Sequence, residues 1–257
     1  MPTYDLAAEL KEYPLTGRFL AGRLRHDMGE REKRILENAI EKTEVFDKPK
    51  RLLERGKVYD RSTLLIDGFL LRTLEGPSQR YAVSFHVPGD FVDLHCFALK
   101  RLDHNLDSLG RVEVGYVSHD KLQNIIRDEP HLARLFWFST LLDAAMHREW
   151  VMKLEQLTTP RRIAHIVAEI RHRLIMVGLG DDNGFVSPLT QTDLSEMSGA
   201  TAIHVNRAIK ELREKNIVDI DRGTATIVDV ERLHAYANFD PAYLYGDGDL
   251  HLREGVG

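Results

Sequence analysis

The sequence predicts an α+β protein with an N-terminal, jelly-roll-like β-roll, then a long helix, then a C-terminal winged helix-turn-helix. Three observations predict this order. Short apolar runs broken by Gly and Pro fill the region before residue 118. Residues 131–157 contain neither Gly nor Pro, and two short helix-like segments flank a glycine near residue 199. We divide the chain into an N-terminal arm (1–28), a β-roll sensor domain (29–117), a helical linker with the long helix (118–157), a winged helix-turn-helix domain (158–237) and a C-terminal tail (238–257).

The composition is that of a soluble globular protein, with 43% hydrophobic and 29% charged residues among 257. No apolar run approaches the roughly 20 residues that span a bilayer, and the N-terminus lacks a signal pattern. The single cysteine, Cys96, excludes an intrachain disulfide and any iron–sulfur cluster built by one chain. We therefore expect a cytoplasmic protein without a membrane partner. The net charge of −5 argues mildly against non-specific nucleic-acid binding.

The region before residue 118 is expected to begin with a charged helix over Gly29–Glu44 and to continue as short strands. Asp67-Gly68, between two apolar runs, predicts a hairpin, because Gly tolerates the positive φ of such turns. Val112–Ser118 is expected to be the closing strand, and Ser118 to cap the helix that follows.

The long helix carries one apolar stripe with a polar end. We interpret it as the seam of a symmetric dimer, and the alternative is a core helix packed on its own sheet. Thr159 followed by Pro160 signals a new helix, so Leu157, Thr158 and Thr159 form a candidate hinge. The expected seam residues are Leu132, Leu135, Phe136, Ser139, Leu142, Met146 and Lys153.

The segment TQTDLSEMSGATAIHVNRAIKELREKN (190–216) predicts a helix, a turn at Gly199 and a second helix. Val205, Ile209 and Leu212 form the buried stripe of the second helix, whose first turn carries no acid. Two short strands around residues 221–224 predict a wing. A small, hydrogen-bonding helix end of this kind can enter the DNA major groove, although an ordinary helical hairpin is the simpler alternative.

In the order of its parts, and in the motifs PGDFVDLH, LTTPRRIAHIVAEI and PLTQTDLSEMSGATAIHVNRAIKELREKNIV, the chain resembles the Crp/Fnr family of bacterial transcription regulators. The likeness covers residues 42–237. It implies a homodimer paired through the long helices, binding a two-fold symmetric operator in double-stranded DNA. It also implies an effector domain that tilts the DNA-binding heads about the hinge in response to a small molecule of unknown identity, and contact with RNA polymerase if the protein is an activator. The alternative is a constitutive regulator that presents its heads without an effector.

Several departures from the family concern the effector. The Gly-Glu pair of the members that bind cyclic AMP is missing, and Leu102 and Asp103 stand where Arg and Ser or Thr are expected. A buried phosphate needs a cation, which only Arg101 could supply nearby, so cyclic AMP is not expected. No cofactor is expected, although haem or a metal stays open as an alternative. Its candidate ligands are His86, His95, Cys96, His104 and His119, and Cys96 is otherwise expected to be buried and inert.

Base reading is assigned to the second helix of the motif. Arg207 matches a base-reading Arg of the family and can contact a guanine edge, whereas Ala202 and Ile203 replace its early Arg-Glu or Glu and could touch thymine methyls. His204 is the fourth base-reading candidate. Thr190, Gln191, Thr201 and Lys210 are the phosphate-contact candidates. The expected function is sequence-specific regulation of transcription, not catalysis. The alternative is a small-ligand or cyclic-nucleotide binding module that regulates a partner protein.

Overall fold

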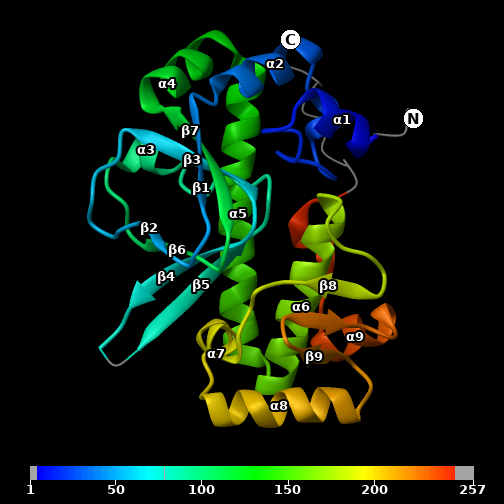
Figure 1. The fold of residues 1–257 in the computed structure, drawn as a ribbon. Helices are drawn as coiled ribbons and strands as arrows, with labels where there is room; N and C mark the ends of the chain where they lie inside the picture. The colour runs from blue at the N-terminus through cyan, green and yellow to red at the C-terminus, as the bar shows by residue number, and fades with distance from the viewer. Residues whose placement is uncertain (1–4, 78, 247–257) are drawn as a thin grey trace.

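The computed structural model describes residues 5–77 and 79–246. The β-roll lies to one side of the long helix α5 (Pro130–Gln156), and the C-terminal helices and wing lie beside the lower half of α5 (Figure 1). Helix α8 (Ala202–Glu214) lies at the end of the molecule farthest from α2 (Glu30–Ala39) and α4 (His119–Asp128). The mixed fold with this order of parts confirms the predicted class.

Two antiparallel sheets form the β-roll, in the strand orders β1-β7-β3 and β2-β6-β4-β5. Leu65 and Val114 of the first sheet share one buried apolar cluster with Leu70 and Leu106 of the second. The alternation of inward apolar residues on both sheets closes this core. The strands are β1 (Lys42–Phe46), β2 (Arg51–Leu53), β3 (Arg61–Asp67), β4 (Leu70–Glu75), β5 (Arg80–His86), β6 (Asn105–Ser108) and β7 (Val112–Ser118), with a short helix α3 (Cys96–Leu99) after β5.

The turn at Asp67-Gly68 is present, but it does not make the expected hairpin. Strand β3 pairs with β7, whereas β4 pairs with β5 and β6, so this turn carries the chain from one sheet to the other. Gly68 has φ +84, and a Cβ there would lie 2.3 Å from the carbonyl oxygen of Arg111. The glycine therefore allows a close corner between sheets, a role that a local turn signal cannot distinguish from a hairpin.

Residues 5–28 are structured and packed, unlike the arm that the sequence suggested. They contain α1 (Leu6–Glu12) and the 3-10 helix η1 (Arg25–Asp27). The ring of Phe19 packs against Phe91 of the roll and Phe136 of α5. Its burial comes from loop contacts, which leave no periodic trace in the sequence.

The expected charged helix ends early. Helix α2 spans Glu30–Ala39, and the chain is extended at Ile40 before β1 begins. Lys42 and Thr43 pair with Tyr116 and Gly115 of β7, so sheet pairing ends the helix where local propensity would have continued it.

The helical linker agrees closely with expectation. Ser118 caps α4 (His119–Asp128) by accepting a hydrogen bond from the Lys121 amide, and α5 follows. Helix α6 (Thr159–Met176) restarts after a break at Leu157 and Thr158. Within residues 5–77 and 79–246, no helix combines the length and the apolar content needed to cross a bilayer.

The C-terminal half is a helical core edged by a three-stranded sheet in the order β8-β10-β9. The predicted wing is formed by β9 (Asp219–Asp221) and β10 (Thr224–Thr226), and β8 (Gly184–Val186) adds a third strand that was not predicted. The remaining elements are α7 (Gln191–Ser198), α8 (Ala202–Glu214), α9 (Val230–Ala237) and the 3-10 helix η2 (Pro241–Leu244). Residues 239 and 244 of the expected tail are buried in this core, and residues 247–257 of that tail lie outside the described part.

The two halves of the chain contact each other directly. Arg80 of β5 lies 2.8 Å from Glu196 and 3.5 Å from Asp193, both on α7. Arg173 of α6 lies 2.5 Å from Asp90 of the roll. The C-terminal half is thus held on the roll by ion pairs at two places.

Candidate nucleic-acid interface

Helix α7 supports the interface from behind. Its N-cap is Thr190, whose hydroxyl accepts from the Asp193 amide at 3.2 Å while its own amide donates to the Asp193 carboxylate at 2.8 Å. This capping box satisfies donors at the helix start. Leu194 and Met197 are buried, and Gly199 ends the helix in the left-handed region at φ +63, as expected for the turn glycine.

Helix α8 presents one face to the core and the opposite face to solvent. Thr201 is its N-cap and accepts from the His204 amide. The predicted stripe of Val205, Ile209 and Leu212 is buried, and Ala208 joins it. The i, i+3, i+4 spacing of these residues fixes the rotation of the helix and thereby decides which side chains are free to read bases.

All four base-reading candidates are exposed. Ala202, Ile203, His204 and Arg207 lie on the solvent face of α8, with Ile203 at 65% exposure. Within the described part of the chain, Arg207 makes no hydrogen bond or ion pair. Its guanidinium is therefore available for an outside partner. Asn206 is exposed beside these four and was not among the predicted site residues.

The phosphate-contact candidates fall into two groups. Thr190 and Gln191 line a hollow of about 330 Å³ together with Arg222, which stands at the tip of the wing. Thr201 marks the start of α8, and Lys210 projects from its exposed side with Glu214 at 3.7 Å. The structure thus brings the start of α7 next to the wing tip. Sequence reasoning missed Arg222, although an Arg in a two-residue wing turn is itself a usable signal.

The two ends of α8 differ in charge, because its acidic residues all lie in the C-terminal half. The first turn carries no acid, as expected, and it includes the backbone amides whose partial positive charge favours a phosphate. The acids lie toward the other end, where Lys215 pairs with Glu211 at 2.6 Å and Arg213 with Asp219 at 2.7 Å. The exposed N-terminal turn is therefore the part of α8 best suited to approach a polyanion.

The candidate hinge lies where α5 and α6 meet. Thr158, rather than Thr159, is the N-cap of α6, and Leu157 is buried. Arg162 donates to the carbonyl of Leu157 at 2.8 Å and to that of Ser198, at the end of α7, at 3.1 Å. The hinge is thus braced to the helix that supports α8.

The expected dimer seam is wrong for most of its residues. Six of the seven residues are buried inside a single chain, and Ser139 is half-buried. The buried six are Leu132, Leu135, Phe136, Leu142, Met146 and Lys153. The sequence could not separate the two apolar faces of α5. The outward face carries Trp137, Leu141 and Val151, at 66%, 53% and 64% exposure.

Lys153, the polar end of the expected seam, is enclosed instead of facing a partner. Its ammonium lies 3.6 Å from the centre of the Trp150 ring and has no hydrogen-bond acceptor among the described residues. Burial lowers the pKa of Lys153 to about 7, opposed by the carboxylate of Glu169.

The residues that replace the cyclic-AMP motif do not supply a buried cation. Leu102 is buried in the apolar core of the roll, and Asp103 is exposed. Arg101, the possible substitute, donates to the Gly56 carbonyl at the surface.

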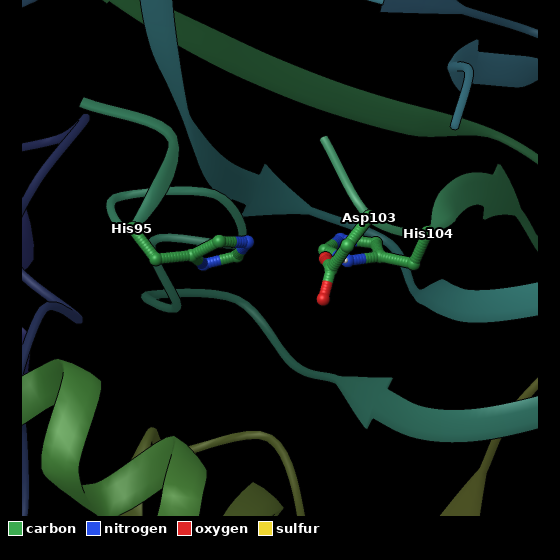
Figure 2. Close-up of side chains that lie close together, drawn as sticks. All are labelled: His95, Asp103 and His104. Carbon is green, nitrogen blue, oxygen red and sulfur yellow. Dashed lines mark hydrogen bonds and ion pairs between the residues drawn. The ribbon is translucent and has the colours of Figure 1, made fainter. Parts of the chain in front are cut away.

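The roll histidines that the sequence offered as ligands divide into separate groups. His95 and His104 lie together beside Asp103 (Figure 2). His86 lies 3.3 Å from Asp90, and His119 lies 3.4 Å from the hydroxyl of Ser62. Cys96 is buried, and its burial raises the pKa of the thiol to about 12, as expected for an inert cysteine.

Comparison with known proteins supports both the motif and the fold. Residues 161–236 match the family described as the Crp-like helix-turn-helix domain. The nitrogen fixation regulation protein FixK of Bradyrhizobium diazoefficiens is 23% identical over 159 residues, which cover 62% of this chain and 66% of FixK. The transcriptional activator protein FnrL of Cereibacter sphaeroides is 30% identical over 124 residues, which cover 46% of this chain and 49% of FnrL. The matched stretches thus span just under two thirds and about half of these relatives.

Solved structures show the same architecture at low identity. The structure of FixK2 from Bradyrhizobium japonicum has a TM-score of 0.69 at 18% identity and covers 76% of this chain and 96% of that one. The c-di-GMP responsive global regulator CLP of Xanthomonas campestris has a TM-score of 0.62 at 12% identity, with coverage of 76% and 97%. These likenesses establish the fold.

Proposed function

We propose, from the premise that this chain belongs to the Crp/Fnr family of transcription regulators, that it acts as a homodimer binding a two-fold symmetric DNA site. The observation that carries the proposal is the exposed, acid-free first turn of α8, followed one turn later by Arg207, which is unpaired within the described residues. One such helix occupies the major groove of each half-site. The activity is binding rather than catalysis, and the compartment is the cytoplasm.

Base reading falls to the exposed face of α8. Arg207 offers two N–H donors to a guanine, and Ala202 and Ile203 offer apolar contact to thymine methyls. His204 is held near the helix start, because its Nδ1 lies 3.1 Å from the Thr201 hydroxyl. The operator therefore differs from that of family members with a Glu at the early positions.

Phosphate contacts come from the rim of this surface. Gln191 and the wing-tip Arg222 line the same hollow, and the side chain of Arg222 is 93% exposed. Lys210 supplies a further cation. Thr201 already uses its hydroxyl as a helix cap, so its backbone amide contributes more than its hydroxyl. Thr190 is engaged with Asp193 through both its hydroxyl and its amide, so its contribution to phosphate binding is small.

The second copy of the chain covers the outward face of α5. This face carries Trp137, Leu141, Ala144 and Val151, at successive spacings of four, three and seven residues. Arg148 occupies the position of the repeat between Ala144 and Val151 and is its one charged member. This is the spacing of a coiled-coil seam. A packed second helix would bury the three large apolar side chains exposed here.

Cyclic AMP is not the effector in this proposal, because Leu102 and Asp103 stand in the roll where the family's phosphate-binding Arg and its Ser or Thr are expected. If the protein activates transcription, as the name of FnrL states for that relative, it also contacts RNA polymerase.

The test is a binding-and-sequencing selection with the full-length protein on random duplex DNA. We expect a two-fold symmetric motif. Ile203→Glu should abolish enrichment, because it places a carboxylate in the first turn of α8, whereas Val58→Glu makes the same change on the exposed surface of the roll and should not. A wild-type protein that enriches no duplex sequence would favour the rival, a small-ligand module acting on a partner protein.

A further inference from the structure

Two histidines and a carboxylate from separate segments of the β-roll converge at its surface. His95 precedes α3, and Asp103 and His104 lead into β6. One ligand atom from each of the three lies within 4.8 Å of the others. The rings of His95 and His104 lie with their centres 5.2 Å apart, with the Asp103 carboxylate beside His104 (Figure 2).

His104 is buried without satisfying its hydrogen-bonding capacity. It is 4% exposed, and its Nδ1 lies 2.7 Å from Asp103 Oδ1. Its Nε2 is buried and has no partner among the described residues. This nitrogen can accept an outside ligand, because no hydrogen bond among the described residues occupies it.

The chemistry of the three side chains suits a metal ion. The cluster offers two imidazoles and one carboxylate, and Asp103 is exposed, so an ion can reach the site from solvent.

We propose that His95, Asp103 and His104 bind a divalent first-row transition-metal ion of the Zn²⁺ or Fe²⁺ class. Imidazole nitrogens with one carboxylate are ligands typical of these ions, whereas Mg²⁺ and Ca²⁺ prefer oxygen alone. Ligand bonds of about 2.1 Å at tetrahedral angles place ligand atoms about 3.4 Å apart. The three ligand atoms now lie within 4.8 Å of one another, so the exposed Asp103 and the half-buried His95 would rotate inward on binding, and solvent would complete the coordination.

The position of the site connects it to the other half of the chain. A loop runs from Asp90 to His95. Asp90 pairs with Arg173 of α6, and the Val92 carbonyl within the loop accepts a hydrogen bond from Arg72 at 2.8 Å. An ion that fixes His95 thus constrains a loop that holds the DNA-binding half. This regulatory consequence rests on the proposed function, whereas the metal site does not.

The experiment measures metal binding without DNA. The full-length protein is stripped with a chelator and titrated with Zn²⁺ by calorimetry, and with Co²⁺ by visible absorption. We expect one ion per chain. We also expect a tenfold or greater loss of affinity in His95→Gln, His104→Gln and Asp103→Asn, and wild-type affinity in His26→Gln, whose imidazole lies outside the cluster.

Three results would overturn the site. One is a wild-type protein that binds neither ion at equimolar concentration. Another is a thiolate-to-cobalt charge-transfer band, which would assign the ion to Cys96. The third is an equal loss of affinity in His26→Gln and in the cluster variants. If His104→Gln does not fold, the exposed Asp103→Asn and the wild-type cobalt spectrum decide the outcome. Operator binding by the stripped protein is measured separately, so the proposed function stands or falls independently.

Discussion

A guanidinium nitrogen of Arg173 lies 2.5 Å from a carboxylate oxygen of Asp90, and this pair joins α6 to the β-roll. A second nitrogen of Arg173 donates to the Phe85 carbonyl at 2.6 Å and lies 3.5 Å from Glu169. Although burial opposes ionisation, the charge of Arg173 holds the pKa of Asp90 at about 2. The contact is therefore charged throughout the physiological range.

Arg173→Met is expected to lower the free energy of unfolding by about 3–5 kcal/mol, because it leaves the half-buried Asp90 and the buried Glu169 without their cation. Urea denaturation measures the change. Arg213→Met removes the exposed pair with Asp219 and should cost about 1 kcal/mol or less. Adding Asp90→Asn to Arg173→Met should recover part of the loss. No recovery in the double variant would contradict a direct pairing.

Lowering the pH is expected to weaken the ion pair between Asp90 and Arg173, because it protonates Asp90. The folded pKa of Asp90, about 2, lies below its ordinary value of 3.8. Its contribution to stability is therefore fully present above about pH 5 and is lost as pH falls through 4 toward 2. The difference in unfolding free energy between wild type and Asp90→Asn, measured by urea denaturation from pH 6 to 3, should shrink toward the acid end. A constant difference would show that Asp90 is not the titrating group.

Lys153→Met is expected to stabilise the protein most at neutral and lower pH. Burial lowers the pKa of Lys153 from 10.5 to about 7, so the cost of enclosing its charge is complete below pH 7 and disappears above pH 10.5. At about 1.4 kcal/mol per pKa unit, the gain at pH 6.5 should exceed that at pH 9.5 by on the order of 3 kcal/mol. Thermal unfolding at both pH values measures it. Lys210→Met, at an exposed position of α8, should show no such difference.

The DNA-binding half was largely predictable, because its signals are local. Each signal can be recognised from residues a few positions apart in the sequence. The signals are the helix caps, the turn glycine and the buried stripe of Val205, Ile209 and Leu212. The third strand, β8, was not predicted. Its three residues have a loop-like sequence and become a strand only because they pair with β10. The same holds for Arg222, whose position beside Gln191 is set by the folded wing.

Long-range contacts account for most of what sequence reasoning missed. Phe19 is buried by Phe91 and Phe136, which are distant in sequence, so the N-terminal segment shows no period. Helix α5 is apolar on two sides, and only the folded chain shows that Leu142 faces inward while Leu141 faces out. The cluster of His95 and His104 likewise forms only when two segments of the roll meet.

The outward face of α5 is expected to hold the dimer together. Leu141→Glu and Val151→Glu each place a carboxylate in the proposed seam, so both variants should sediment as monomers at micromolar concentrations where the wild type is a dimer. Val58→Glu, on the exposed surface of the roll, should stay dimeric. Leu142→Glu should instead destabilise the fold, because Leu142 is buried within one chain. If Leu142→Glu were folded and monomeric while Leu141→Glu stayed dimeric, the dimer seam would be the inward stripe of α5 and not its outward face.

Arg207 is expected to set base preference at one position of each half-site. It is exposed on α8 and unpaired within the described residues, and a bidentate contact to guanine is worth about 1–3 kcal/mol. Arg207→Ala should therefore weaken operator binding by that amount per half-site and relax selectivity at that base, as measured by binding-and-sequencing. Arg213→Ala removes an arginine from the same helix whose charge is already matched by Asp219, and it should leave the motif unchanged. An unaltered motif in Arg207→Ala would mean that this side chain contacts phosphate, in which case affinity would fall equally for all sequences and the salt dependence would decrease.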